Sequence, residues 1–316
     1  MASLATRSLS KVPDRREAGR PGRARAFREG ASPYLYVLPA MLLYGTFVCY
    51  PMLRLVQYSF TKWDGTSTPN NIGLSNYNEL IRDPLFWQAF RHNLEWMFAA
   101  IAIPTLIGLA LAIVLARSHL FGRTIFRAVF FLPQILSSIV IAAIWQWLYS
   151  PSFGAINAAL KAAGLSSLQQ GWLGDTNFAL PAVFIAWAWT AYGFAMVILI
   201  AAIQSVDEEY FDAAKIDGAG RLRQMTAILL PAIRRPLTVV MLMNAIAALQ
   251  AFDLVFIMTK GGPINSTMVL ALYVYQNAFI SLRVGYGSAI AVVLGIVIVI
   301  SSLVFLRIRG LWGGKE

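Results

Sequence analysis

The residues whose types and spacing suit a specific task gather in one polar segment, residues 205–235, with the sequence SVDEEYFDAAKIDGAGRLRQMTAILLPAIRR. Apolar runs of about 20 residues flank it, which is the length that crosses a bilayer as a helix. A plain connector would need only a handful of polar residues. The density of charges and glycines predicts instead a folded element that faces water and binds another protein.

The start of this segment has the pattern of a helix N-terminus. The sequence Ser-Val-Asp-Glu at residues 205–208 fits a capping box, in which the serine accepts from the first turn and the glutamate reaches back. We therefore expect a helix over about residues 206–217. Helical spacing would bring Tyr210, Phe211 and Ala214 together on it.

Glycine and proline divide the rest of the segment. Gly218 and Gly220 predict a turn that residues with a side chain would make only under strain. A second helix is expected over about residues 221–230, ended by Pro231. Two short helices around a glycine turn predict a docking knob.

Residues suited to catalysis or metal binding are sparse. The chain has two histidines, His92 and His119, far apart in the sequence, and one cysteine, Cys49. No His/Cys cluster has the spacing of a metal site, and no Ser, His and acid arrangement indicates a nucleophile. The phosphate-loop motif G-x-x-x-x-G-K-[ST] is missing. An enzyme inside the membrane is therefore disfavoured, and any ATP that drives this protein must be bound by another polypeptide.

The composition indicates the surroundings of these residues. Of 316 residues, 58% are hydrophobic and 13% are charged, and the mean hydropathy is +0.62. A soluble domain usually carries about 25% charged residues. The apolar surface exceeds what one aqueous core could hide, and the apolar stretches contain prolines and glycines that membrane helices tolerate. The chain is predicted to be a polytopic membrane protein.

The formal charge of +11 lies in the tails and at the ends of apolar segments. This placement follows the positive-inside rule and does not form the basic face of a nucleic-acid binder. Most of the 26 Lys and Arg residues share the side of the N-terminus, so both termini are expected in the cytoplasm. We expect a basic disordered tail over residues 1–33, a membrane domain over residues 34–310 and a cytoplasmic tail over residues 311–316.

Six apolar segments are each long enough to cross about 30 Å of hydrocarbon as a helix. The expected fold is therefore all-α, with six transmembrane helices. Residues 205–235 then face the cytoplasm, and three loops, 59–92, 149–177 and 259–285, face outside. The expected spans are residues 34–58, 93–116, 125–148, 178–203, 237–258 and 286–306.

The polar segment also matches a family motif. Its pattern resembles the EAA loop of binding-protein-dependent ABC importer permeases, which reads Glu-Ala-Ala, three residues, Gly, nine residues, Ile-x-Leu-Pro. Asp212 stands where the family has Glu, which keeps the charge and shortens the reach. The positions that carry the resemblance are Asp212, Ala213, Ala214, Gly218, Ile228, Leu230 and Pro231.

The resemblance extends over roughly residues 34–310. Residues 252–267 and 285–292 are similar to the carbohydrate-uptake subfamily, specifically to the maltose-type F and glycerol-phosphate-type A permease subunits. Residues 73–87 and 130–149 resemble the same group.

This resemblance implies a non-catalytic permease subunit of a bacterial or archaeal cytoplasmic (inner) membrane. A second permease would pair with it, and two ABC ATPase subunits would bind underneath and hold ATP and Mg, so no cofactor is expected in this chain. An extracytoplasmic solute-binding protein would dock outside. Tyr210 joins the motif residues in the implied ATPase-coupling set, in which small side chains allow the helix to enter a cleft of the ATPase.

The resemblance also implies a sugar pathway on the spans on either side of the EAA loop. Sugars bind aromatic platforms together with amide or hydroxyl groups. Interhelical packing is the open alternative for each candidate. The implied pathway residues are Trp187, Thr190, Ala191 and Phe194 on the fourth span, and Asn244, Ala247, Ala248, Ala251 and Asp253 on or after the fifth.

Carboxylates near a span are costly and are usually paired or functional. We expect Arg283 or Lys260 to pair with Asp253. Only Asp253 and Glu95 support the alternative of a stand-alone ion-coupled secondary transporter, which would need embedded carboxylates or broken helices. The substrate stays open among sugars, sugar alcohols and glycerol phosphate. The middle of the fourth and fifth spans has no Lys or Arg, which favours a neutral sugar.

Overall fold

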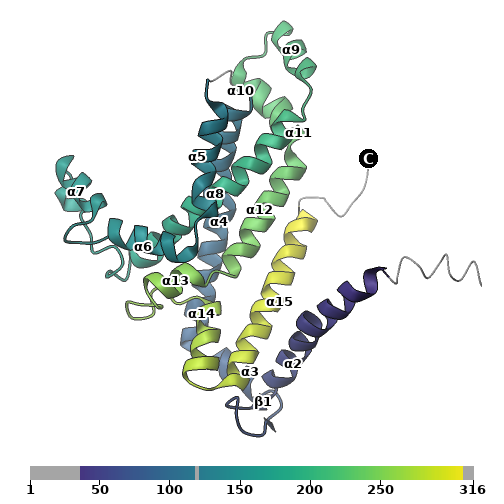
Figure 1. Ribbon diagram of the computed structural model, residues 1–316, viewed down its shortest axis with the longest axis vertical. Helices are drawn as coiled ribbons and strands as arrows, with labels where there is room; N and C mark the ends of the chain where they lie inside the picture. Colours follow the sequence, from purple (N-terminus) through teal and green to yellow (C-terminus); the bar gives the residue numbers. More distant parts are fainter. Residues whose placement is uncertain (1–35, 118–120, 309–316) are drawn as a thin grey trace, which may run out of the picture. The chain divides into compact units, whose positions relative to one another are not determined.

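The computed structural model describes residues 36–117 and 121–308, and these are mostly helical (Figure 1). The two predicted tails, residues 1–33 and 311–316, lie outside the described residues. The one short hairpin of the described chain pairs β1 (Thr61–Lys62) with β2 (Asn70–Asn71). The predicted all-α class is confirmed.

The chain divides into two units, residues 1–54 and 55–316. The described part of the first unit is helical from Tyr36 to Arg54, and none of its described side chains is buried. The helix contains a π turn, η1 (Gly45–Cys49), and continues into the second unit as α2 (Tyr50–Ser59). Tyr36–Ser59 is long and apolar enough to span a membrane, in agreement with the predicted first span.

The second unit contains three further unbroken helices that are long enough to span a membrane, and two bent pairs. The first pair bends by 97° and the second by 71°, so the described chain has four unbroken candidate spans, or six if each pair counts as one. The long helices are α4 (Pro84–Arg117), α8 (Ala179–Gln204) and α15 (Val284–Ile308). The bent pairs are α5 (Arg123–Ile135) with α6 (Ser138–Leu148), and Arg221–Ala232 with α12 (Arg234–Leu249).

Helix breaks correct two of the predicted spans. The predicted span at residues 125–148 breaks at Leu136, which has an extended backbone, and α6 restarts with the Ser137 hydroxyl accepting from Val140 N–H at 3.4 Å. The predicted span at residues 237–258 ends at Leu249, and a separate helix, α13 (Asp253–Met258), follows. Hydropathy measures apolar length but does not register a change of helix direction.

Helix α8 is the centre of the second unit and lies against α4, α5 and α12. Gly108 of α4 makes the approach close, because a Cβ there would come within 2.6 Å of Ala195 Cβ and 2.8 Å of Met196 N. Small residues allow membrane helices to approach in this way. Ala182, Ala186 and Ala195 of α8 are also buried.

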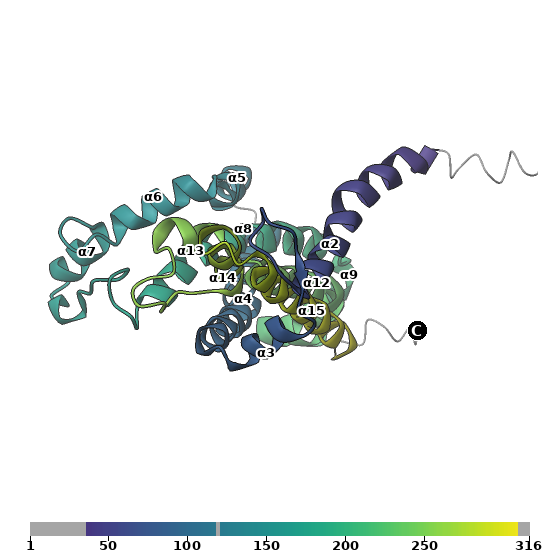
Figure 2. The same cartoon turned by 90° about the horizontal axis from the view of Figure 1, so that it is seen from below.

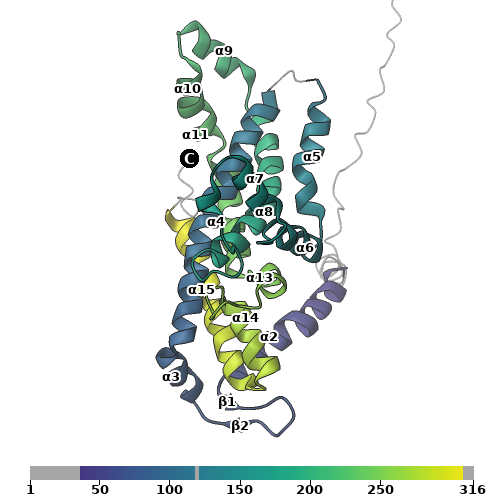
Figure 3. The same cartoon turned by 90° about the vertical axis from the view of Figure 1, so that its left-hand side faces the viewer.

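The second unit has two ends with different structures (Figure 3). The segment between α8 and α12 lies at one end, and the β1–β2 hairpin with α3 lies at the other. Helices α6 and α7 project to one side of α4 and α8 (Figure 2). Outside the segment between α8 and α12, the remaining short helices are α3 (Ser75–Arg82), α7 (Ala155–Ala162), η2 (Ser166–Leu168), α14 (Leu270–Tyr275) and the π turn η4 (Gln276–Ile280).

Candidate functional site

The polar segment forms a helical knob, residues 205–233, which begins with α9 (Glu208–Ile216). The predicted capping box is wrong. Ser205 is the C-cap of α8, and its hydroxyl donates to Ala202 O at 2.8 Å. Asp207 occupies the N-cap of α9 without a side-chain capping bond. The serine remains with α8 because that helix extends to Gln204, and Ser205 N–H donates to Ala201 O as its C-cap.

Helix α9 ends in a Schellman motif, which needs a left-handed residue after the helix. Gly218 has a φ of 76° and donates from N–H to Lys215 O at 3.0 Å, while Ala219 N–H donates to Ala214 O at 2.8 Å. Gly220 has an ordinary φ of −67° and is the N-cap of the next helix. The expected need for glycine therefore holds at Gly218 and is wrong at Gly220.

The second knob helix consists of α10 (Arg221–Gln224), the π turn η3 (Met225–Leu229) and α11 (Leu230–Ala232). Pro231 does not end it, contrary to the prediction. A proline lacks an N–H and clashes with the carbonyl four residues before it. The π turn relieves that clash, because Leu230 N–H donates to Met225 O, five residues back.

The knob is anchored by apolar side chains. Phe211 is 8% exposed and belongs to a buried cluster with Leu229, Ile233 and residues of α4, α8 and α12. Tyr210 is 62% exposed, so the expected shared face of Tyr210 and Phe211 is wrong. Neighbouring residues on a helix are about 100° apart, which separates the two rings.

The outer surface of the knob carries most of the predicted coupling residues. Tyr210, Asp212, Ala213 and Gly218 are exposed, and Ala214 is partly exposed. The Asp212 carboxylate pairs with Lys215 on the same helix at 2.8 Å. In the second helix Pro231 is exposed and Ile228 and Leu230 are partly exposed, which leaves Leu229 as the buried member.

Five predicted pathway residues line one cavity of about 330 Å³, here called the central cavity. It lies where α8, the α5–α6 break and the α12–α13 break meet, so both helix breaks contribute polar side chains to it. The five residues are Trp187, Thr190, Ala247, Ala251 and Asp253.

The other four predicted pathway residues lie outside the central cavity. Ala191 and Ala248 are buried between helices, and Phe194 is partly exposed elsewhere on α8. Asn244 is 4% exposed and donates from Nδ2 to Thr105 Oγ1 at 3.2 Å. That bond joins α12 to α4. Asn244 therefore has the role of an interhelical contact, which the sequence analysis gave as the alternative to a sugar contact.

The central cavity also contains polar residues that the sequence analysis did not select. Gln134, Ser138 and Gln250 line it together with Trp96. Ser138 Oγ donates to Asp253 Oδ2 at 3.3 Å. Gln134 and Gln250 are polar amides within or beside apolar runs of the sequence. This position next to apolar residues is the signal that could have identified them as candidate pathway residues.

The predicted partner of Asp253 is wrong. Arg283 donates to both carboxylate oxygens of Glu79 at 2.6 Å and lies over the Tyr286 ring, 4.5 Å from its centroid. Among the described residues the structure records no ion pair between Lys260 and Asp253. Asp253 is exposed at the first turn of α13, where the helix dipole favours a carboxylate.

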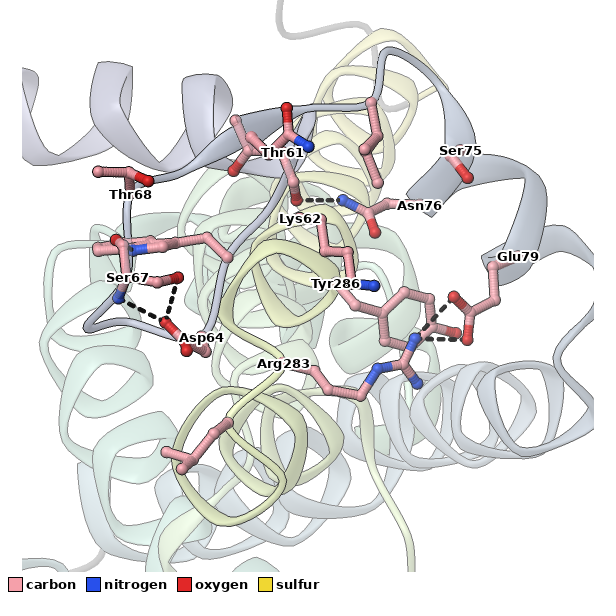
Figure 4. A pocket seen from close by; sticks show the side chains of 14 residues that line it. Thr61, Lys62, Asp64, Ser67, Thr68, Ser75, Asn76, Glu79, Arg283 and Tyr286 are labelled. Carbon is pink, nitrogen blue, oxygen red and sulfur yellow. Dashed lines mark hydrogen bonds and ion pairs between the residues drawn. The ribbon is translucent and has the colours of Figure 1, made fainter.

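A second polar region surrounds a cavity of about 590 Å³ at the hairpin end (Figure 4). Asp64 lies in the hairpin loop, and hydrogen bonds from the Ser67 and Thr66 backbones hold its pKa well below the usual value. Figure 4 shows Glu79 of α3 facing Arg283, beside Tyr286 of α15.

Asp83 connects three elements at this end. Its Oδ2 accepts from the hydroxyls of Tyr273 on α14 and Tyr286 on α15, the latter at 2.6 Å. Burial raises the pKa of Asp83, but these two bonds and backbone N–H groups outweigh burial, so the pKa lies below its ordinary value of 3.8. Burial and Asp83 raise the pKa of Tyr273 to about 12. The hairpin end is thus held by hydrogen bonds between distant parts of the chain.

Within residues 36–117 and 121–308, no group of His, Cys, Asp or Glu could hold a metal ion. His92 is 4% exposed, and its Nδ1 lies 2.8 Å from Met268 O, which gives it a structural contact.

Comparison with known proteins identifies similar chains. A family model described as a binding-protein-dependent transport system inner membrane component matches residues 105–311. The diacetylchitobiose uptake system permease protein NgcF of Streptomyces coelicolor is 35% identical over 94% of this chain and 88% of its own length. A probable ABC transporter permease protein of Pyrococcus horikoshii is 36% identical over 83% of this chain and 90% of its own length.

More distant likenesses agree with these. The trehalose/maltose transport system permease protein MalF of Thermococcus litoralis is 29% identical over 89% of this chain and 95% of its own length. A chain of a bacterial ABC transporter that imports the acidic polysaccharide alginate shares the fold, with a TM-score of 0.80 and 21% identity. That match covers 92% of this chain and 99% of the other.

Proposed function

The chain belongs to the family of binding-protein-dependent transport system inner membrane components, and from this membership we propose how it works as the permease subunit of a sugar ABC importer. Together with a second permease it forms a path for a neutral oligosaccharide. The observation that carries the proposal is the water-facing knob between α8 and α12, on a chain whose sequence has no phosphate loop. The energy must then enter from a partner through a surface of this kind.

The knob transmits movement because its anchor is shared. Phe211 packs in the same apolar cluster as residues of α4, α8 and α12, so α9 cannot shift without disturbing those helices. Interiors at native density transmit strain in this way. A nucleotide-driven ATPase that grips Tyr210, Asp212 and Ala213 would therefore move the walls of the central cavity. No residue of this chain acts in catalysis, and ATP and Mg belong to two ATPase subunits.

The central cavity suits a neutral sugar. Trp187 offers an aromatic face, and Gln134 and Gln250 offer amide donors and acceptors. Asp253 and Ser138 add hydrogen-bonding groups, and no Lys or Arg lines this cavity. A phosphorylated substrate would call for such a cation. The names of the relatives NgcF and MalF mention diacetylchitobiose, trehalose and maltose, which are neutral disaccharides and the first to test.

The proposal also assigns the sides of the membrane. The protein is a multi-pass membrane protein. Both termini and the knob face the cytoplasm, and the hairpin end faces the solute-binding protein outside. One of the alginate transporter structures contains a periplasmic protein with a bound alginate pentasaccharide, which supports such a partner here. The ion-coupled alternative loses support because Glu95 is exposed and pairs with Arg91 at 3.4 Å.

Uptake by the reconstituted importer tests this function. The chain, its sister permease, the ATPase subunits and the binding protein are placed in proteoliposomes with labelled diacetylchitobiose, maltose or trehalose outside. We expect uptake of at least one sugar that stops without ATP and is unchanged when ionophores collapse ion gradients. Uptake driven by an ion gradient without the ATPase subunits would establish the secondary transporter instead.

A further inference from the structure

Trp96 of α4 separates two cavities. Its ring lines the central cavity and also a cavity of about 390 Å³ between α4 and the start of α8, here called the α4–α8 cavity. The indole is 2% exposed and lies edge-on to the rings of Phe184 and Trp187, with centroids 5.7 and 6.2 Å away. The two cavities are therefore neighbours that share one aromatic wall.

The far wall of the α4–α8 cavity is the loop after α13, and α4 fixes it in place. Met268 O lies 2.8 Å from His92 Nδ1, and Leu270 N–H donates to Asn93 Oδ1 at 2.7 Å. Asn93 also donates from Nδ2 to Leu249 O at 3.1 Å. These buried contacts hold Ser266 at the edge of the cavity, so the cavity is a built feature of the fold.

Two residues that line this cavity each have a buried polar atom without a hydrogen-bond partner. These atoms are Trp96 Nε1 and Ser266 Oγ. Buried donors and acceptors in native proteins are almost always satisfied, and each unsatisfied one costs about 1 to 3 kcal/mol. The indole N–H needs an acceptor, and the serine hydroxyl can donate or accept. The hydroxyl groups of a sugar ring can fill both roles.

The rest of the lining narrows the class of ligand. Asn177 and Thr176 add amide and hydroxyl groups, and Phe184 adds an aromatic face. Arg91 and Glu95 also line the cavity but pair with each other at 3.4 Å, which leaves no net charge for an ionic ligand. Aromatic faces with neutral hydrogen-bonding groups suit a carbohydrate.

We propose that the α4–α8 cavity is a second carbohydrate subsite, in which Trp96 Nε1 and Ser266 Oγ bind hydroxyl groups of a neutral oligosaccharide. The sugar is then bound on either side of the Trp96 ring, with one unit in this cavity and the next in the central cavity or on its way there. This inference rests on the proposed function, because it needs a carbohydrate as the transported solute.

Fluorine NMR of the complete importer labelled with 5-fluorotryptophan tests the subsite. The probes are diacetylchitobiose, maltose and trehalose at millimolar concentration. Trp96→Phe and Trp145→Phe assign the two resonances by their loss. Trp145 is the matched reference, because its buried Nε1 also lacks a partner but it lines neither cavity. We expect at least one sugar to shift the Trp96 resonance and leave the Trp145 resonance unchanged.

A cavity-filling variant separates the two cavities. Ala99 lines the α4–α8 cavity and not the central cavity. Ala102 on the same helix is exposed and lines neither cavity. Ala99→Leu should abolish the sugar-induced shift at Trp96 and weaken sugar binding about tenfold, since a methylene-sized clash costs about 1 to 3 kcal/mol. Ala102→Leu should behave as the wild type. Ser266→Ala, which adds no bulk, should weaken binding about threefold to tenfold.

The outcomes that overturn the subsite differ from those that overturn the function. If a sugar is taken up with ATP but Trp96 does not shift, or shifts equally in Ala99→Leu, only water fills this cavity and the subsite is wrong. If the wild-type importer takes up none of the sugars and Trp96 responds to none, the carbohydrate function fails and the subsite fails with it.

Discussion

The knob and the hairpin end are stabilised by different kinds of contact. Polar bonds of the knob are local, such as Asp212 to Lys215 at 2.8 Å, and its anchor to the helices is the apolar cluster around Phe211. At the hairpin end some polar bonds join residues about 200 positions apart, as between Arg283 and Glu79 or Tyr286 and Asp83.

The difference teaches how each end is held. At the hairpin end Glu79 pairs with Arg283 and Asp83 accepts from two tyrosines, while Ile81 and Leu282 remain exposed. The knob instead has local polar bonds and also leaves apolar side chains exposed, with Tyr210 at 62%, Ile216 at 87% and Leu222 at 70%. Exposed apolar groups gathered on one element indicate an interaction site. We infer that the hairpin end is held together by bonds within the chain and that the ATPase binds the exposed surface of the knob.

The largest expected effect comes from Gly218→Val in the knob. Gly218 has open space around it, so the substitution acts only through its φ of 76°, at a cost of about 1 to 2 kcal/mol for a residue with a side chain. Because that strain falls on the docking surface, we expect ATP-driven uptake to fall about tenfold or more while sugar binding is retained.

Gly220→Val is the matched control. Gly220 also has open space around it but has an ordinary φ of −67°. Uptake and ATPase activity should remain close to wild type in this variant. Equal uptake by the two valine variants would contradict the role of the turn.

The next effect is a loss of stability at the hairpin end. In Gly285→Ala the new Cβ would overlap the Thr61 carbonyl oxygen of β1. Overpacking costs about 1 to 3 kcal/mol, so the thermal unfolding midpoint of the purified protein should fall. Gly295→Ala, in open space on the same helix, should leave the midpoint unchanged. ATPase binding should survive both changes, and its loss in Gly285→Ala would mean that the two ends are not independent.

Acid should weaken the hairpin end through Asp83. The folded-state pKa of Asp83 lies below its ordinary value of 3.8, so its ionised form stabilises the fold above that pH. That stability is lost as the pH falls through the lower folded-state pKa. Asp83→Asn should therefore be less stable than wild type near neutral pH, and the difference should shrink below about pH 4. A constant difference in melting temperature across the acid range would assign the effect to another group.

The smallest effects separate two exposed ion pairs. Glu79→Gln removes the pair with Arg283 and Asp212→Asn removes the pair with Lys215, and each should cost less than about 1 kcal/mol of stability. Only Asp212→Asn should also weaken binding of the ATPase, measured by titrating ATPase subunits onto the permease pair. Equal weakening by Glu79→Gln would remove the contrast between the two ends.

Local chemistry was readable from the sequence, whereas pairing across the fold was not. Gly218 was predicted because a short helix that must stop has few alternatives to glycine. The membrane helices were also predicted, because apolar segments of about 20 residues match the thickness of a bilayer. Arg283 or Lys260 was expected to pair with Asp253 because all three were placed near the same side of the membrane, but the structure pairs Arg283 with Glu79, 204 residues away. A single sequence carries no signal for such a contact.

The central cavity was predicted in part. Trp187 and Thr190 were found because the family places sugar contacts there, but the contribution of Gln134 and Ser138 depends on the 97° bend between α5 and α6. Hydropathy cannot indicate that bend. Asn244 bonds to Thr105 of a neighbouring helix and does not line this cavity. The sequence left both roles open, because an amide on an apolar helix can serve either a ligand or another helix.

Crosslinking of the knob to the ATPase is the most direct test of the central claim. In a Cys49→Ser background, Ala213→Cys places a thiol on an exposed position of α9, and Ala163→Cys places one on an equally exposed alanine at the end of α7. With the complete importer and a maleimide–benzophenone reagent, which needs a thiol on this chain alone, we expect Ala213→Cys to form a crosslinked product with the ATPase subunit and Ala163→Cys to form none. No product from Ala213→Cys in an importer that still couples ATP to uptake would contradict the account.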